Sequence, residues 1–443
     1  MAKKRAKYSP AKILLSSIIF TIFVGTLLLS LPIAQISPIP LLDNFFMSTS
    51  ATTVTGLTTV AIANYTVFGQ CVILFLIQIG GLGLITMTLF MISLFTDLGF
   101  GTQLMAGQLL ELEGWKNIKK LIFFIIGFTA IFESIGTILI YFSIRHEYAV
   151  HTALYYSIYQ SISSFCNAGL YVFTENFSFF KYNEMLLATT AALVLSGGLG
   201  FIIWHEIISY FWLKSHKKRA TLSLHSKIAL YSTAILIASA ACFYGILEYN
   251  NTLGILSQPM IAMNALFNAI TCRSAGFSTV PISELQFATQ FIIMLYAFVG
   301  SSPGSTGSGI KTTTFAIFAG TVKAAITGKT TVELRGRRIA QDQVFKALAI
   351  TVLSLSWIIA TTFCLLITEK GWDFLDILFE VVSAFATLGL TTGITPYLSV
   401  TGKFFIIITM IIGRIGPLTM VLALRKKAET TEFTYPEERV MLG

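Results

Sequence analysis

Four short polar segments of this chain each end in a glycine followed by a large apolar residue. The carbonyl oxygens of their backbones could bind a cation. The first segment contains Thr53-Val54-Thr55-Gly56-Leu57. The other three end in Gly169-Leu170, Gly276-Phe277 and Gly389-Leu390. Glycine adopts backbone conformations that a Cβ hinders, so turns of this kind can aim carbonyl oxygens at one point. A ring of carbonyl oxygens can replace the hydration shell of a cation.

The four glycines recur at a nearly constant spacing. Gly56, Gly169, Gly276 and Gly389 are 113, 107 and 113 residues apart. A second small-residue cluster begins 24, 28, 24 and 24 residues later, at Gly80-Gly81, Gly197-Gly198, Gly300 and Gly413. Close helix packing alone could explain one copy. Four copies at matching offsets predict four equivalent units around one axis.

The elements that must position these turns are membrane helices. The chain has 443 residues, of which 55% are hydrophobic and 12% charged, whereas soluble domains carry about 25% charged residues. Apolar runs of about 20 residues, which are typical of spanning helices, recur along its length. We therefore expect an all-α polytopic membrane protein with four pseudo-repeats of helix, re-entrant pore loop and helix. Its eight spans would surround one central pore.

The boundaries of these units can be placed from the apolar runs. We expect tails at 1–12 and 425–443, and repeats at 13–95, 119–214, 226–325 and 345–424. The second spans are expected at Val72 to Leu94, Met185 to Trp212, Phe291 to Thr321 and Phe404 to Leu424. A shorter helix precedes each glycine, at Leu41 to Ala51, Leu154 to Phe165, Pro259 to Ile270 and Phe374 to Phe385.

These half-helices are too short to cross the membrane. About 11 residues at about 1.5 Å per residue fall well below the ~30 Å of hydrocarbon, so each must enter and leave on one side. Irregular backbone at membrane depth is tolerated only where it is buried in protein or lines water. The negative C-terminal ends of four half-helices would favour a cation at the centre. The turn segments hold no carboxylate, which favours a monovalent ion.

The distribution of basic residues predicts the orientation. Of the 30 Lys and Arg, 23 fall in five alternate segments, at 3–12, 116–120, 214–227, 323–346 and 425–439. This asymmetry places those segments and both termini in the cytoplasm. The net charge of +9 therefore indicates a multi-pass membrane protein in contact with lipid, and no nucleic-acid partner. The five histidines lack ligand or triad spacing and no nucleophile motif is present, so we expect neither an enzyme nor an organic cofactor.

Thr53-Val54-Thr55-Gly56-Leu57 resembles the filter loop of potassium channels reduced to one glycine. Together with the four repeats, it makes nearly the whole chain resemble the Trk/Ktr/HKT superfamily of potassium transporters. The short N-terminus resembles the membrane subunit of bacterial Ktr systems. The resemblance implies that K⁺ binds the backbone carbonyls of the four glycines. It also implies a selectivity filter made of Thr55, Gly56, Asn167, Ala168, Gly169, Ser274, Ala275, Gly276, Leu388 and Gly389.

A run of ten small residues and proline, from Gly300 to Gly309, interrupts the third repeat. Such a run does not stay helical, and we expect an intramembrane loop across the permeation path. The resemblance implies that this loop is a gate, although a passive kink remains an alternative. It also implies that Arg414 is an electrostatic barrier, with a structural anchor as the alternative. The expected gate residues are Gly300, Ser302, Pro303, Gly304, Ser305, Thr306, Gly307, Gly309, Lys311 and Arg414.

Other charged residues fall in apolar or pore-like sequence. Arg273 lies three residues before Gly276, and a buried ion pair with Glu380 would support the filter. Alternatively, each side chain meets backbone or water. Glu133 and Glu206 are expected to make structural hydrogen bonds rather than relay protons or sodium. The glycine runs near Gly80 and Gly197 lack the flanking strand of a phosphate loop, so close helix packing is the expected role.

The expected function is K⁺ uptake down its electrochemical gradient across a bacterial cell membrane, with Na⁺ dependence left open. The resemblance implies a homodimer and a cytoplasmic ring of nucleotide-binding regulatory subunits (KTN/RCK type). One rival is a secondary transporter that works by alternating access, although parallel repeats disfavour it. Another is an assembly subunit with no transport of its own. Ion flux from the purified protein would discriminate among the three.

Overall fold

The computed structural model describes residues 10–83, 118–173, 177–217, 221–424 and Pro436. Within these ranges the chain is mostly helical, and its only sheet is a hairpin of β1 (Glu333–Leu334) and β2 (Arg337–Arg338). The expected all-α fold is therefore correct apart from this hairpin. Residues 1–9 of the N-terminal tail, residues 84–94 of the first return span and nearly all of the C-terminal tail lie outside the described residues.

The helices fall into four successive sets, which we call quarters. The first quarter holds α1 (Pro10–Leu29), α2 (Leu41–Thr53) and α3 (Val67–Gly81). The second holds α6 (Ile118–Ile144), α7 (Val150–Cys166), α8 (Glu184–Gly198) and α9 (Phe201–Ser215). The third holds α10 (Leu224–Glu248), α11 (Gln258–Thr271), α12 (Phe287–Phe298) and α13 (Thr312–Ile326). The fourth holds α14 (Gln341–Thr368), α15 (Phe374–Ala386), α16 (Val400–Ile415) and α17 (Pro417–Leu424).

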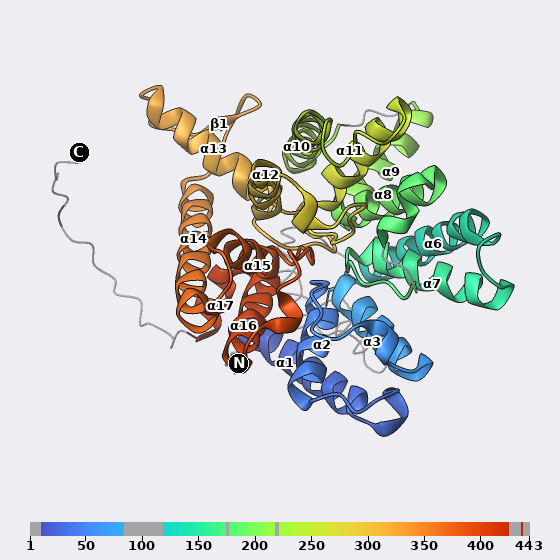
Figure 1. Ribbon diagram of the computed structural model, residues 1–443. Coiled ribbons are helices and arrows are strands. Elements are labelled where there is room, and N and C mark those ends of the chain that lie inside the picture. Colours follow the sequence, from blue (N-terminus) through green and yellow to red (C-terminus); the bar gives the residue numbers. More distant parts are fainter. Residues whose placement is uncertain (1–9, 84–117, 174–176, 218–220, 425–435, 437–443) are drawn as a thin grey trace, which may run out of the picture.

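The four quarters surround a common centre, as Figure 1 shows from blue to red. In each quarter the helix after the turn packs against the short helix of the next quarter, so that α3 contacts α7, α8 contacts α11 and α12 contacts α15. The series closes because α16 contacts α2. An ion pair of 2.7 Å between Lys403 and Asp43 joins these last two helices. The chain therefore forms a closed ring of four parts.

The short helices α2, α7, α11 and α15 occupy the inside of this ring. They contain 13, 17, 14 and 13 residues, and their C-terminal halves are buried. Short helices thus lie where the half-helices were predicted, with the largest difference in bounds at the start of α7. Hydroxyls in these segments bond to carbonyls of their own helix, as Thr53 does to Thr49 (2.7 Å) and Ser164 to Gln160 (2.6 Å). This local bonding lets polar residues be buried at the centre of an apolar protein.

Two of the helices that follow the turns are broken at a glycine. The axis bends by 96° between α8 and α9, where Gly200 has φ +93°, and α16 ends before Gly416, where φ is +88°. The second spans expected at Met185 to Trp212 and Phe404 to Leu424 are therefore each made of two helices rather than one. A positive φ lies outside the α-helical region, and Pro417 follows the second break without a backbone N–H.

Within the described residues, three helices are long and apolar enough to cross a membrane. They are Lys120–Ile144, Leu224–Glu248 and Gln341–Thr368, which begin the second, third and fourth quarters. The bent pair α8 and α9 together would make a fourth. The exposed side chains on these helices are largely apolar, for example Ile235, Ile359 and Phe363, as expected where a helix faces lipid rather than water.

Candidate functional site

The four turns after the short helices share one backbone conformation. The residue two positions before each glycine is left-handed, with φ of 56° at Val54, 61° at Asn167, 67° at Ser274 and 47° at Thr387. The glycines themselves also have positive φ, at 98°, 67°, 75° and 86° for Gly56, Gly169, Gly276 and Gly389. Non-glycine residues seldom adopt this region. Its recurrence at one offset in four unlike sequences indicates that the backbone, rather than the side chains, is what the turns have in common.

The four turns meet in a ring. A Cβ placed on Gly56 would lie 2.5 Å from the carbonyl oxygen of Ala168, the residue before the next glycine. The same relation holds from Gly169 to Ala275 (2.9 Å) and from Gly276 to Leu388 (2.6 Å). The ring closes because a Cβ on Gly389 would collide with the carbonyl oxygen of Thr55. Each glycine therefore leaves room for a carbonyl of the neighbouring quarter, and the four predicted glycines come together.

Serine side chains hold three of the turns. The Ser50 Oγ accepts a hydrogen bond from Gly56 N (3.0 Å), and the Ser383 Oγ accepts one from Gly389 N (3.1 Å). The Ser163 Oγ accepts one from Leu170 N (3.2 Å). The sequence analysis missed these serines as supports. Their signal is a serine six positions before the glycine in three of the four turns.

The third turn departs from this pattern, since Ile270 stands where the others have serine. There the hydroxyl of Ser274 donates to Ala386 O at 2.9 Å and so binds the third turn to the end of α15. Arg273 donates to Gly300 O at 2.9 Å, at the start of the interrupted segment. The third turn is thus held by side-chain bonds to its neighbours in addition to the bonds to its own helix, such as that from Ala275 N to Thr271 O (3.1 Å).

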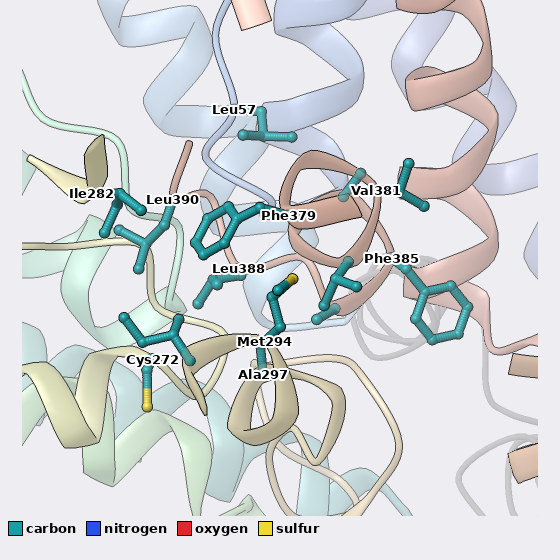
Figure 2. Close-up of a cluster of buried hydrophobic side chains, with 14 of the residues drawn as sticks. Leu57, Cys272, Ile282, Met294, Ala297, Phe379, Val381, Phe385, Leu388 and Leu390 are labelled. Carbon is teal, nitrogen blue, oxygen red and sulfur yellow. The ribbon is translucent and has the colours of Figure 1, made fainter. Parts of the chain in front are cut away.

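Apolar packing surrounds the turns. Figure 2 shows Leu388 and Leu390, which flank Gly389, beside Phe379 of α15. The cluster also contains Met294 of α12. These side chains are buried, so the backbone of the turn is fixed between a packed apolar layer and the adjacent turns.

The second set of glycines allows close packing, as predicted for Gly80 and Gly197. A Cβ on Gly80 would collide with the carbonyl oxygen of Thr52 in α2. A Cβ on Gly197 would likewise collide with the carbonyl oxygen of Phe165, and a Cβ on Gly413 with that of Phe385. Each of these glycines lets its helix touch the C-terminal end of a short helix directly. Three of the four offsets therefore reflect one repeated contact, whereas a Cβ on Gly300 would collide with the carbonyl oxygen of Ser308.

The segment from Val299 to Lys311 joins α12 to α13 as a loop, which confirms the predicted interruption. It closes on itself where Ser301 N donates to Ser308 O (3.2 Å). It also binds the break between α8 and α9, because Ser302 N donates to Gly198 O (3.1 Å) and Phe201 N donates to Gly304 O (3.0 Å). Its side chains Ser302 and Thr306 are fully buried.

Two positively charged side chains, Arg414 and Lys311, donate hydrogen bonds to this loop. Arg414 donates to Thr306 O at 2.5 Å and to Ser308 Oγ at 3.1 Å. Its other nitrogen donates to Gly80 O, so that one guanidinium joins the first, third and fourth quarters. Lys311 donates to Gly307 O at 2.7 Å. These bonds are the contacts that the anchor alternative required of Arg414.

The predicted ion pair between Arg273 and Glu380 does not form. Glu380 accepts hydrogen bonds from Thr391 (2.8 Å) and Thr395, both in the segment that leaves the fourth turn. Arg273 instead reaches the carbonyl at the end of α12. Arg273 therefore meets backbone, as the alternative expected, and Glu380 meets threonine hydroxyls rather than a cation.

The half-buried carboxylates Glu133 and Glu206 make hydrogen bonds, as predicted. Glu206 accepts from Ser223 Oγ (2.9 Å) and Ser226 Oγ (2.7 Å), where α9 meets the start of α10. Glu133 of α6 accepts from Gln78 of α3 at 3.3 Å and so links the first two quarters. Within the described residues, no group of three or more His, Cys, Asp or Glu side chains could hold a metal ion.

Known proteins resemble this chain over its whole length. It is 34% identical to the potassium/sodium uptake protein NtpJ of Enterococcus hirae, over 99% of this chain and 98% of that protein. It is also 34% identical to the Ktr system potassium uptake protein B of Bacillus subtilis, over 99% and 98% of the two chains. The same-named protein of Vibrio alginolyticus is 33% identical over 100% and 96%.

The fold also matches a solved structure, the potassium transporter TrkH from Vibrio parahaemolyticus. The TM-score is 0.69 with 18% identity, over 96% of this chain and 87% of that one. This likeness supports a helical membrane-protein fold. A family model described as a cation transport protein, TrkH, matches residues 7–434. Because that match spans almost the entire sequence, the chain belongs to the TrkH family of cation transport proteins.

Proposed function

We propose that this protein takes up K⁺ across the bacterial cell membrane through a pore at the centre of the four quarters. One observation carries the proposal, namely the cyclic approach of each turn glycine to the carbonyl of the next turn. A ring of backbone oxygens suits a cation that has shed its water. The names of the relatives, which are uptake proteins for potassium or for potassium and sodium, support the choice of ion.

The four turns are the proposed selectivity filter, with K⁺ held by the backbone carbonyls of the glycines and of the residues before them. In this account the four quarters are the four pseudo-repeats, α2, α7, α11 and α15 are re-entrant pore helices, and the remaining helices make eight spans. Arg273 and Glu380 support the filter separately, each through its own hydrogen bonds.

The loop from Gly300 to Gly309 is the proposed gate. Its buried hydroxyls lie between the third turn, the break after α8 and the guanidinium of Arg414. In such a position a loop that changes its hydrogen bonds could open or close the path below the filter. Lys311 and Arg414 would hold the closed arrangement and place positive charge in the path of a cation.

Regulation is proposed to come from outside the chain. Both termini would be cytoplasmic, the membrane subunit would form a homodimer, and a ring of nucleotide-binding subunits would contact the C-terminal tail and the basic linkers other than the hairpin of β1 and β2. The family to which the chain belongs and the alternation of basic segments support this arrangement. Na⁺ would act as a second transported ion or as an activator.

The test is ion flux from the purified protein in liposomes. We expect K⁺ flux to exceed Na⁺ flux at equal gradients. We also expect K⁺ flux to rise with the K⁺ gradient without the transport of a second ion in a fixed ratio. A flux that requires a coupled ion in strict ratio would favour alternating access. Absence of flux from protein that elutes as one folded species would favour an assembly subunit.

A further inference from the structure

A basic hairpin follows α13, in a part of the molecule that the proposed pore does not use. Leu334 pairs with Arg337 across β1 and β2. The turn residues Arg335 and Gly336 have φ of 52° and 73°. A two-residue turn with two positive φ values usually has Asn, Asp or Gly at its first position. The left-handed backbone of Arg335 is therefore unfavourable, which suggests that its side chain has a role.

The hairpin has a rigid base. A Cβ on Gly320 of α13 would lie 3.1 Å from Leu334 and 3.2 Å from Val332, so both side chains pack directly on that helix. The backbone N–H of Ile339 donates to Val332 O at 2.9 Å. Val332 and Ile339 are buried with Val344 of α14. The arginines thus project from a base that is fixed between α13 and α14.

The hairpin carries uncompensated positive charge. The segment 323–346 holds two acidic residues, and each already lies beside a lysine. Glu333 is 3.0 Å from Lys329, and Asp342 is 3.8 Å from Lys346. The three arginines are exposed, and none forms an ion pair with another described residue; they are Arg335, Arg337 and Arg338.

The hairpin borders the apolar surface of the helices. The guanidinium carbon of Arg335 lies 3.4 Å from the ring centre of Tyr231 on α10. Tyr231 stands one turn from Ile235, and the side chains of Ile326 and Phe345 on the neighbouring helices are also exposed. Figure 1 shows α13 and the hairpin at the outer rim of the molecule. Tyrosine and arginine at the end of a lipid-facing surface are typical of the headgroup region.

We propose that Arg335, Arg337 and Arg338 form a binding site for the phosphate headgroup of an anionic lipid. Arginine binds phosphate oxygens in a bidentate geometry, and the ring of Tyr231 orients one guanidinium at the membrane boundary. The cytoplasmic leaflet, where basic segments concentrate, carries the anionic lipid. The site rests on the proposed membrane orientation but not on K⁺ conduction, and its test therefore measures lipid binding without ion flux.

The test uses the full-length protein in detergent, titrated with phosphatidylglycerol or phosphatidylcholine and followed by native mass spectrometry. We expect phosphatidylglycerol to bind the wild type more tightly than phosphatidylcholine. Arg335→Ala should weaken that binding roughly fivefold, and the triple substitution R335A/R337A/R338A more than about twentyfold. The triple lysine variant should recover part of the binding, because charge is kept while bidentate geometry is lost.

Arg145 offers a matched control. Its guanidinium carbon lies 5.1 Å from the ring centre of Phe142, which is a similar stacked arrangement at a predicted external loop. Arg145→Ala should leave phosphatidylglycerol binding unchanged. Equal binding of the two lipids, or equal affinity in the wild type and the triple alanine variant, would overturn the proposal. Competition by millimolar inorganic phosphate as effective as that by the lipid would also overturn it, since the site would then serve free phosphate.

Discussion

Each turn glycine combines a positive φ with a neighbouring carbonyl too close for any side chain. At Gly56 both constraints act together, with φ of 98° and the oxygen of Ala168 in the space of a Cβ. The first constraint concerns the local backbone, whereas the second concerns the distance between quarters. Substitution at this position should therefore alter the ring itself rather than one turn alone.

Gly56→Ala tests this at one residue. We expect K⁺ uptake to fall at least about tenfold, because overpacking of about 1–3 kcal/mol must be relieved by moving the Ala168 carbonyl. The measurement is K⁺ uptake by cells that lack other uptake systems, normalised to protein in the membrane.

The control for this variant is Gly127→Ala. Gly127 lies in α6 with nothing within 4 Å of an added Cβ, so alanine there should be tolerated and should slightly favour the helix. Uptake and selectivity of Gly56→Ala equal to those of Gly127→Ala would exclude the ring from the permeation path.

Arg414 also acts at the residue scale. Its guanidinium bonds to Thr306 O, Ser308 Oγ and Gly80 O, so Arg414→Ala removes a positive charge, two contacts with the loop and one with α3. We expect K⁺ flux in liposomes to rise several-fold. Arg414→Lys should give a smaller rise in flux. The positive charge remains, but the simultaneous contact of one guanidinium with the loop and with Gly80 O is lost. A folded Arg414→Ala protein with unchanged flux would refute the barrier.

At the scale of elements, the loop between α12 and α13 is the part most open to a direct test. Deletion of Ser302 to Gly307 removes its bonds to Gly197 and Gly198. We expect a marked increase in K⁺ flux, provided that the variant inserts into the membrane and elutes like the wild type. A correctly inserted deletion variant with wild-type flux would show that the loop is a passive connection.

Short helices and glycine turns were predictable because their signals are local. A run of about 11 residues that ends in small residues and glycine predicted α15 to within one residue of its observed end. The breaks at Gly200 and Gly416 were missed, since small residues clustered in an apolar run also allow close helix packing and only the positive φ reveals the break. The separate hydrogen bonds of Arg273 and Glu380 were left as an alternative to the ion pair, because two charges in neighbouring segments do not reveal which partner each side chain meets.

For the molecule as a whole, the sequence predicted that there are four quarters. It did not predict which helices of one quarter contact the next. Closure depends on α16 returning to α2, where Lys403 and Asp43 form their ion pair. The repeat period predicts equal parts, and only the folded chain places the last part beside the first.

Assembly is a further prediction at this scale. Truncation after Lys427, within the tail that lies outside the described residues, should weaken dimerisation or binding of the regulatory ring. Size-exclusion chromatography with light scattering would measure the loss. A truncated protein that assembles like the full-length chain would remove the tail from the assembly contacts.

The central claim is that K⁺ passes through the ring made by the four turns. The most direct measurement is anomalous diffraction from crystals of the protein grown in Rb⁺, which substitutes for K⁺ and can be located by its own scattering. We predict a peak on the axis of the ring, bounded by the carbonyls of Thr55, Ala168, Ala275 and Leu388. Rb⁺ bound elsewhere in the membrane region, with the ring free of it, would contradict the account.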